Sequence, residues 1–392
     1  MILKEHKKHT AINRPANGSF ARNEWAILGA PCSVIKELAD LIISALAPQY
    51  KCAYADTSHN DDLMQLPGSM GVGAALEYTD QINFSQLNYQ EPLTVFHQRA
   101  LFAGMDLVLV NGNHQHAKAQ VLIIDNRKKV SLQKKERQLT NVQMIILADE
   151  SEEIYDFVKE VVPEWQHLPT FKLADTAQIV DFFQAGIQEA TPKLNGLVLA
   201  GGKSLRMGTD KGTLEWFGKG QRYHMADLLN VHCSEVFISC RDEGQMQEID
   251  LEYQSLMDTF TGLGPYGAIL SAFREQPDAA WLVVACDLPL IDEATLLNLQ
   301  RNRNPTYLAT AYHSAATNFP EPLITVWEPK AYPVLLQYLA QGYSCPRKVL
   351  INSDIHLLEL PDQEVLANVN TPEEMERVKR IITERSTPAN AD

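Results

Sequence analysis

A glycine-rich loop that carries three cations is the strongest chemical signal in the sequence. It reads LAGGKSLRMGTDKGTL over residues 199–214 and directly follows an apolar, strand-like run. Paired glycines let backbone N–H groups approach a phosphate without interference from a Cβ atom, and Lys203, Arg206 and Lys211 can neutralise its oxygens. The loop has neither the Walker A nor the G-x-G-x-x-G spacing. The alternative, a turn with solvated basic residues, fits poorly in a chain of net charge −15.

An aspartate at a predicted strand end could supply the metal ligand that phosphate chemistry requires. Asp287 follows the apolar run WLVVAC, so we expect it at the carboxyl end of a central parallel strand, where open α/β sheets bind ligands. Mg²⁺ takes one or two carboxylates together with substrate phosphates. A lone strand-end aspartate is commonly a helix cap or turn residue, but the glycine-rich loop makes a metal ligand the better interpretation. We interpret Cys286 as a small core residue.

Four motifs in order resemble the signature of the molybdenum cofactor guanylyltransferases, a MobA-like family of nucleotidyltransferases. They are the glycine-rich loop, MDTFTGLGPYGAI (257–269), CDLP (286–289) and NVNTPEEM (368–375). The resemblance covers roughly residues 194–383. It implies a Rossmann-like nucleotidyltransferase fold and Mg²⁺ as cofactor.

The resemblance also implies a role for individual residues. Nucleotide binding is implied for Leu199, Ala200, Gly201, Gly202, Lys211, Ser239, Asp258 and Asp287. Catalytic roles are implied for Arg206, Lys211 and Asp287, with Asp287 as the metal ligand. Acceptor binding is implied for Asn368, Asn370 and Arg347. A turn and helix cap is an equal alternative for the two asparagines, and a solvated helix face is one for Arg347. The family has an Asn where this chain has Ser239, which leaves the base open.

The implied reaction transfers a nucleoside monophosphate. A phosphate of the acceptor attacks the α-phosphorus of the donor and pyrophosphate leaves, so positioning and charge neutralisation do most of the work. The predicted donor is GTP and the predicted acceptor is the phosphate of molybdopterin. Another donor or acceptor stays open, such as CTP with molybdopterin or a sugar or alditol phosphate, and so does a non-catalytic protein that binds and delivers the cofactor to molybdoenzymes. The oligomeric state is left open.

The first half has the outline of a phosphate-binding loop without its functional residues. The loop GAPCSVIK spans residues 29–36. A Walker A motif from Gly29 would need Gly, Lys and Ser or Thr at positions 34–36, which hold Val, Ile and Lys. The segments YADTSHNDD (54–62) and DLVLVNGNHQHAKAQVLI (106–123) resemble the GTP-binding MobB-like accessory protein. The resemblance implies a degenerate P-loop-like accessory domain that has lost NTP hydrolysis.

Two minor features of that half are left open. The helix N-terminus at Ser33 could hold an anion through its backbone N–H groups. His59, His114 and His116 could bind a metal, but an exposed loop is the simpler interpretation of N-G-N-H-Q-H.

The composition of the chain and the order of its predicted elements indicate its fold class and the partners it is expected to have. The chain has 392 residues, and strand-like runs alternate with helical patterns. We therefore predict two α/β domains, 1–190 and 191–392, each an open, mostly parallel sheet flanked by helices. The net charge of −15 argues against nucleic-acid and anionic-membrane partners. Scattered cysteines and the absence of a secretory signal pattern predict a cytoplasmic protein with reduced thiols.

Overall fold

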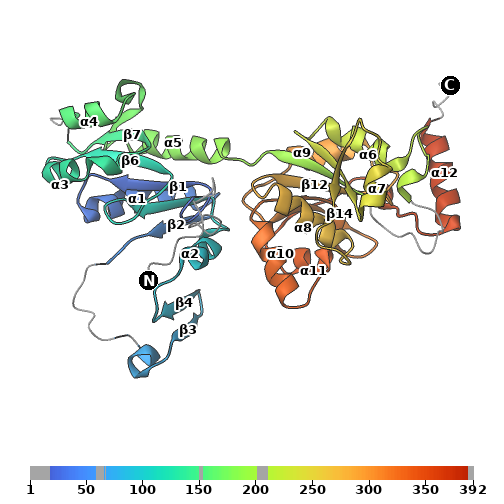
Figure 1. The fold of residues 1–392 in the computed structure, drawn as a ribbon, viewed down its shortest axis with the longest axis horizontal. Helices are drawn as coiled ribbons and strands as arrows, with labels where there is room; N and C mark the ends of the chain where they lie inside the picture. Colours follow the sequence, from blue (N-terminus) through green and yellow to red (C-terminus); the bar gives the residue numbers. More distant parts are fainter. Residues whose placement is uncertain (1–17, 59–65, 67, 150–152, 201–210, 387–392) are drawn as a thin grey trace, which may run out of the picture. The chain divides into compact units, whose positions relative to one another are not determined.

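Alternating strands and helices build two separate main sheets (Figure 1). The computed structural model describes residues 18–58, 66, 68–149, 153–200 and 211–386. The chain divides into two units, Met1–Ala190 and Thr191–Asp392. Each unit has one main sheet with helices on both faces, so the predicted α/β fold class is confirmed.

The first unit is built on a six-stranded sheet in the order β2-β5-β1-β6-β7-β8, with every pairing parallel. Its strands are β1 (Glu24–Leu28), β2 (Cys52–Ala55), β5 (Leu107–Asn111), β6 (Ala119–Ile124), β7 (Val142–Leu147) and β8 (Thr170–Lys172). Its helices are α1 (Cys32–Leu46), α2 (Val95–Phe102), α3 (Lys129–Lys134), α4 (Asp156–Val161) and α5 (Thr176–Glu189). The central strands are almost entirely buried and largely apolar, because a parallel sheet is covered on both faces.

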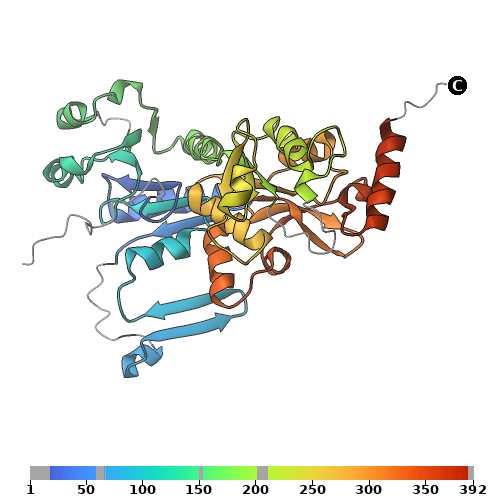
Figure 2. The ribbon, with the colours of Figure 1, turned by 45° about the vertical axis from the view of Figure 1, so that its right-hand side comes forward.

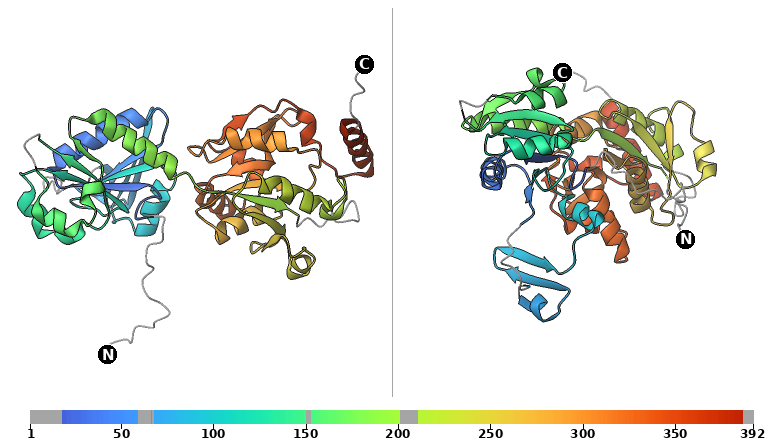
Figure 3. Two further views of the ribbon diagram at one scale, coloured as in Figure 1. Left: turned by 90° about the horizontal axis from the view of Figure 1, so that it is seen from above. Right: turned by 60° about the vertical axis from the view of Figure 1, so that its left-hand side comes forward.

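Helices cover both faces of this sheet (Figure 3). On one face α1 packs Ile35, Leu38 and Ile42 onto the strands, together with α5. These positions recur every three or four residues, which places them on one side of a helix. On the other face α3 and α4 pack against a second cluster that includes β6 and β7.

A two-stranded antiparallel ribbon, β3 (Leu76–Gln81) and β4 (Phe84–Tyr89), stands outside the main sheet (Figure 2). Leu76 pairs with Tyr89 and Tyr78 pairs with Leu87. Both strands are largely exposed. The sequence analysis did not predict this ribbon.

The second unit contains a seven-stranded sheet in the order β11-β10-β9-β12-β14-β13-β15. Its strands are β9 (Leu194–Leu199), β10 (Val236–Cys240), β11 (Gln254–Met257), β12 (Ala280–Ala285), β13 (Ala309–Ser314), β14 (Phe319–Trp327) and β15 (His356–Leu358). Strands β9 to β12 pair in parallel, and β14 is antiparallel to both of its neighbours. The sheet is therefore mixed, with a parallel half built from the first four of its strands.

The helices of the second unit are α6 (Gln221–Asn230), α7 (Glu243–Gln247), α8 (Pro265–Glu275), α9 (Glu293–Arg301), α10 (Ala331–Ala340), α11 (Pro346–Ile351) and α12 (Pro372–Ser386). The helices α6 and α9 pack on one face of the sheet, and α8, α10 and α11 pack on the other (Figure 1). Two smaller contacts matter for the site: α7 lies against β10 and β11, and α12 packs Val378 against Leu290 and Val369.

Some predicted bounds differ from the structure. The pattern over 152–162 predicts a helix, yet α4 begins only at Asp156, because Tyr155 is extended and packs its ring on Phe157. The strand expected over 280–289 ends at Ala285, which leaves Asp287 in the turn after it. No helix in the described part of the chain has an apolar stretch long enough to cross a membrane.

Candidate active site

The carboxyl ends of β9 and β12 meet at the point where the order of the sheet changes direction. β10 lies on one side of β9 and β12 on the other, and Leu199 pairs with Ala285 at the ends of these strands. The Cys286 N–H also donates a hydrogen bond of 3.3 Å to the Leu199 carbonyl. Loops that leave neighbouring strands toward opposite sides open a crevice between them, and α/β sheets bind ligands there.

Ala200 leads from the end of β9 into the glycine-rich loop, and Asp287 follows the end of β12. Gly201, Gly202, Lys203 and Arg206 lie outside the described residues. The chain is described again from Lys211, the first residue of a short 3-10 helix, Lys211–Thr213, and the Lys211 side chain is not part of the description. The roles predicted for these residues stay predictions.

The first residue of the loop is held by a buried glutamine. The Gln245 side chain donates to the Ala200 carbonyl at 2.8 Å and accepts from the Arg241 N–H at 3.0 Å. Its own N–H is capped by Asp242, and the side chain is buried. Gln245 is not among the residues predicted from the sequence, although Asp242 and Gln245 have the spacing of a capping box.

Two residues predicted to bind nucleotide lie against each other. Ser239, near the end of β10, donates a hydrogen bond of 2.9 Å to the Asp258 carboxylate. Asp258 follows β11, and its N–H bonds to the Cys240 carbonyl at 2.7 Å. Burial raises the pKa of Asp258 to about 6, and the Ser239 hydrogen bond opposes that rise. Ser239 thus holds a half-buried carboxylate at the crevice edge.

The predicted acceptor loop lies directly against Asp287. The N–H of Val369 donates to the Asp287 carbonyl at 2.9 Å, and Val369 is buried. Asn368 and Asn370 flank this anchor. The cap of α12 is formed by a reciprocal pair instead: the Glu374 N–H donates to the Thr371 hydroxyl, and the Glu374 carboxylate accepts from the Thr371 and Asn370 N–H groups.

An ion pair whose acidic partner is buried joins α11 to β14. Arg347 at the start of α11 donates to Glu321 of β14 at 3.1 Å, and the Glu321 side chain is 7% exposed. Burial raises the pKa of Glu321, the Arg347 guanidinium opposes this, and the negative charge of Asp287 adds to it. Arg347 is therefore a partly exposed cation that is paired with Glu321, and its predicted role in acceptor binding stays a prediction. The sequence analysis did not single out Glu321.

The carboxylate of Asp287 is a ligand that suits a hard divalent cation. Asp287 contributes one half-buried carboxylate, and its charge acts on the buried Glu321 carboxylate, so the local field favours a cation. No group of three or more His, Cys, Asp or Glu side chains among the described residues could hold a metal by itself. Mg²⁺ takes few protein carboxylates and completes its octahedral shell with water and substrate phosphates. The residues present therefore fit Mg²⁺ bound together with a nucleotide.

In the first unit the strand-to-helix turn is short. β1 ends at Leu28 and α1 begins at Cys32, so positions 34–36 lie in its first turns and Ile35 is in the core. Gly29 is required, because its φ is +93° and a Cβ there would lie 2.3 Å from the Ile123 carbonyl oxygen. The loss of NTP hydrolysis stays a prediction. His59 lies outside the described residues.

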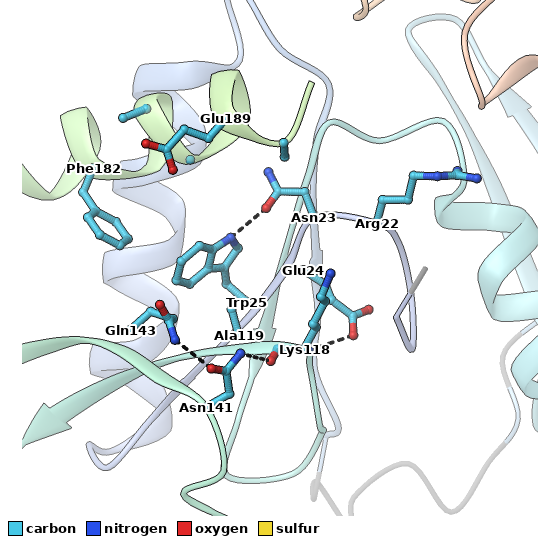
Figure 4. Close-up of a pocket in the computed structure, with 13 residues that line it drawn as sticks. Arg22, Asn23, Glu24, Trp25, Lys118, Ala119, Asn141, Gln143, Phe182 and Glu189 are labelled. Atoms are coloured by element: carbon cyan, nitrogen blue, oxygen red, sulfur yellow. Dashed lines mark hydrogen bonds between the residues drawn. The ribbon is translucent and has the colours of Figure 1, made fainter. Parts of the chain in front are cut away.

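The first unit also has a cavity of about 490 Å³ at the amino ends of β1 and β6 (Figure 4). Trp25 and Phe182 form its apolar wall, and Asn141 and Gln143 hydrogen-bond to each other at 2.7 Å on its rim. It lies at the edge of the sheet opposite to the one where α/β sheets bind ligands.

Known proteins resemble the second unit most clearly. Residues 196–356 match the model of the MobA-like NTP transferase domain. A molybdenum cofactor guanylyltransferase of Pseudomonas putida is 30% identical over 200 residues, which is 48% of this chain and 98% of that protein. A molybdopterin-guanine dinucleotide biosynthesis protein A of Archaeoglobus fulgidus has a solved structure that is 22% identical, with a TM-score of 0.43; it covers 48% of this chain and 99% of that one.

A longer relative is also similar. The molybdenum cofactor biosynthesis bifunctional protein of Synechocystis sp. is 34% identical over 222 residues, which is 56% of this chain and 62% of that protein. The chain thus spans less than two thirds of that relative. The family model, the full-length match in Pseudomonas putida and the geometry of the crevice agree. The chain therefore belongs to the MobA-like nucleotidyltransferases, and its second unit is a nucleotidyltransferase domain.

Proposed function

We propose that the protein transfers GMP from GTP to the phosphate of molybdopterin or its molybdenum-loaded form, with release of pyrophosphate, and that Mg²⁺ is required. One observation carries this proposal. The crevice between β9 and β12 brings together the start of the glycine-rich loop, Asp287 and the Asn368–Asn370 segment. A nucleotide segment and an acceptor segment that meet at Asp287 would hold the donor and the attacking phosphate close together, as a phosphate-to-phosphate transfer requires.

On the donor side, the backbone at Leu199 and Ala200 together with Gly201 and Gly202 would contact the nucleotide. Gln245 fixes the direction of the Ala200 carbonyl, and therefore of the chain entering the loop. Asp258, held by Ser239, would accept a hydrogen bond from the nucleoside. Arg206 and Lys211 would hold the triphosphate and stabilise the charge that develops on it.

On the acceptor side, Asn368 and Asn370 would donate hydrogen bonds to the incoming molecule, and Arg347 would attract its phosphate. Glu321 keeps the guanidinium in place. Asp287 would hold Mg²⁺, which when bound supplies Lewis-acid polarisation of the donor phosphates. A phosphate nucleophile is ionised near neutral pH, so no protein base is required.

Pyrophosphate release from each of the four ribonucleoside triphosphates, measured with and without a molybdopterin-type acceptor and with and without Mg²⁺, tests this proposal. We expect release from GTP only when both are present. Release from CTP instead would show that cytosine is the preferred base. The base is open because Ser239 stands where the family has an Asn. Tight cofactor binding without any release would favour a delivery protein.

A further inference from the structure

We propose that the first unit contains a second reactive site, in which the Cys32 sulfur attacks anionic disulfides and forms a mixed disulfide, while the His114 imidazole takes the thiol proton. The proposal does not depend on nucleotidyl transfer. It rests on two residues that the sequence analysis left without a function, one in the degenerate loop and one in the N-G-N-H-Q-H segment.

The geometry of the pair is that of an activated thiol. The Cys32 sulfur lies 3.3 Å from Nε2 of His114, which comes from the loop between β5 and β6. Asn113 donates a further, longer hydrogen bond to the same sulfur at 3.8 Å and ties its own side chain to the Ala30 carbonyl at 2.9 Å. The imidazole can take the thiol proton, and the amide N–H then faces the thiolate.

The backbone around Cys32 also places hydrogen-bond donors at the start of a helix. Cys32 is the first residue of the 15-residue helix α1, and no side chain caps that helix. The N–H groups of a first helical turn and the helix dipole stabilise a negative charge placed there. The thiol is also partly accessible to solvent, which a nucleophile needs.

A cavity of about 110 Å³ lies against the pair and gives the site a preference for anions. Two cations line it, Lys128 just before α3 and Lys135 just after it, together with Ser131 and Gln138. Ammonium groups bind carboxylates through charge-assisted hydrogen bonds. A disulfide whose arms carry carboxylates, such as oxidised glutathione, therefore matches both the thiol and the cations.

Further charged or titratable groups near the Cys32–His114 pair come from the end of β2 and from α1. Asp56 and Tyr54 lie at the end of β2: hydrogen bonds from Asn111, Tyr54 and Thr57 offset burial and hold the pKa of Asp56 below its ordinary value, with the charge of His114 contributing. Burial raises the pKa of Tyr54, and Asp56 and Cys32 add to that rise. On α1 itself Lys36 pairs with Asp40. Asp56 is thus placed to stabilise the imidazolium that the exchange forms.

The step is a thiol–disulfide exchange, in which the disulfide substrate is the oxidant and no further reagent is needed. The Cys32 thiolate attacks one sulfur of the disulfide, a new S–S bond forms as the old one breaks, and the departing thiolate takes the proton from His114. Cys32 ends in a mixed disulfide and one thiol is released. All six cysteines are free in the fold, so resolution requires an external thiol.

The test uses the full chain and compares the alkylation of Cys32 with that of the exposed Cys345 in the same digest, by mass spectrometry. Iodoacetamide and iodoacetate react through the same iodomethyl carbon, but only iodoacetate carries a negative charge, and the Cys345 rate corrects for their intrinsic difference in reactivity. We expect Cys32 to react faster than Cys345, and His114→Gln to slow both reagents at Cys32 by about tenfold. Replacing both lysines, Lys128→Gln with Lys135→Gln, should slow iodoacetate by about threefold more than iodoacetamide. Cys345 should not change.

Oxidised glutathione is the second probe. We expect one glutathione per chain, on Cys32, with no uptake by Cys32→Ser and slow uptake by the His114 variant. Equal melting temperatures and an unchanged Cys345 rate show that the variants fold. If Cys345 reacts as fast as Cys32, or if folded His114→Gln labels like the wild type, the proposal is wrong. If Cys32 reacts quickly but the Lys128→Gln, Lys135→Gln variant slows both reagents equally, the proposed preference for anionic disulfides is wrong.

Discussion

At the scale of single residues, the Ser239–Asp258 contact ties nucleotide binding to pH. Burial raises the pKa of Asp258 from 3.8 to about 6. Between these values the folded state binds more protons at this group than the unfolded state does, so this group lowers stability as the pH rises through that window. Asp258→Asn removes the effect. Relative to wild type, the variant should gain about 1 kcal/mol in the free energy of unfolding between pH 4 and pH 7, after allowance for partial exposure.

Nucleotide affinity should show the opposite trend. If the ionised Asp258 accepts a hydrogen bond from the nucleoside, the nucleotide Kd should increase as the pH falls below about 6. Ser239→Ala removes the donor that stabilises the carboxylate, so the midpoint of that profile should move to higher pH. The matched control is Ser255→Ala on the neighbouring strand. Identical profiles for Ser239→Ala and wild type would exclude this role.

The Glu321–Arg347 pair makes a prediction on the acceptor side. Glu321→Gln keeps the shape but leaves the guanidinium without its charged partner, which should cost about 1–3 kcal/mol of stability. The KM for the acceptor should increase, because Arg347 loses its positioning partner, and the KM for GTP should stay the same. Glu364→Gln, in the exposed pair with Arg377, is the control. An equal effect on both substrates would point to a structural role only.

The residues differ in how far the sequence could predict them. Asp287 follows an apolar run, so its type and place indicate a site, whereas Asp258 was predicted only from the resemblance of the segment 257–269 to a family motif. Glu321 and Gln245 acquire their roles from partners 26 and 45 residues away. Such contacts depend on the tertiary fold, and a single polar residue in a strand or short helix carries no signal of them. The roles of Arg206 and Lys211 remain predictions from the loop.

At the scale of elements, α7 controls the start of the glycine-rich loop. Gln245→Ala leaves the Ala200 carbonyl and the Arg241 N–H without this partner, which should cost about 1–2 kcal/mol. The KM for GTP should increase more than kcat falls, since the loop loses its orientation. Gln247→Ala, on an exposed position of the same helix, is the control. A folded Gln245→Ala enzyme with unchanged KM would contradict this role.

Helices and strands were predictable from the sequence where burial of one face gives a repeating apolar pattern, or where burial of both faces gives a continuous apolar run. Strands β1, β5 and β12 are buried throughout and largely apolar, and α5 begins at Thr176, where the helical pattern TAQIVDFFQAGI (176–187) also begins. The ribbon β3–β4 was missed because both strands are largely exposed and mixed in polarity. The short α4 starts late because packing of Tyr155 overrides the local helical pattern.

At the scale of the whole molecule, the two units have separate cores, and the nucleotidyltransferase family model matches only the second. We expect residues 191–392, expressed alone, to fold and to release pyrophosphate from GTP with the acceptor. We expect residues 1–190 alone to hydrolyse no GTP, since positions 34–36 lack the Walker A residues. Hydrolysis by the first unit would contradict its predicted degeneracy. An inactive but folded second unit would show that transfer requires both.

The most direct measurement follows the α-phosphate itself. GTP labelled at the α-phosphorus is incubated with the full chain, Mg²⁺ and the molybdopterin-type acceptor, and the label on the acceptor is counted. Wild type and the exposed control Asp250→Asn should transfer label, whereas Asp287→Asn should lose about a thousandfold or more of the rate while it keeps its melting temperature. Full transfer by folded Asp287→Asn, or label that never leaves GTP in wild type, would contradict the account.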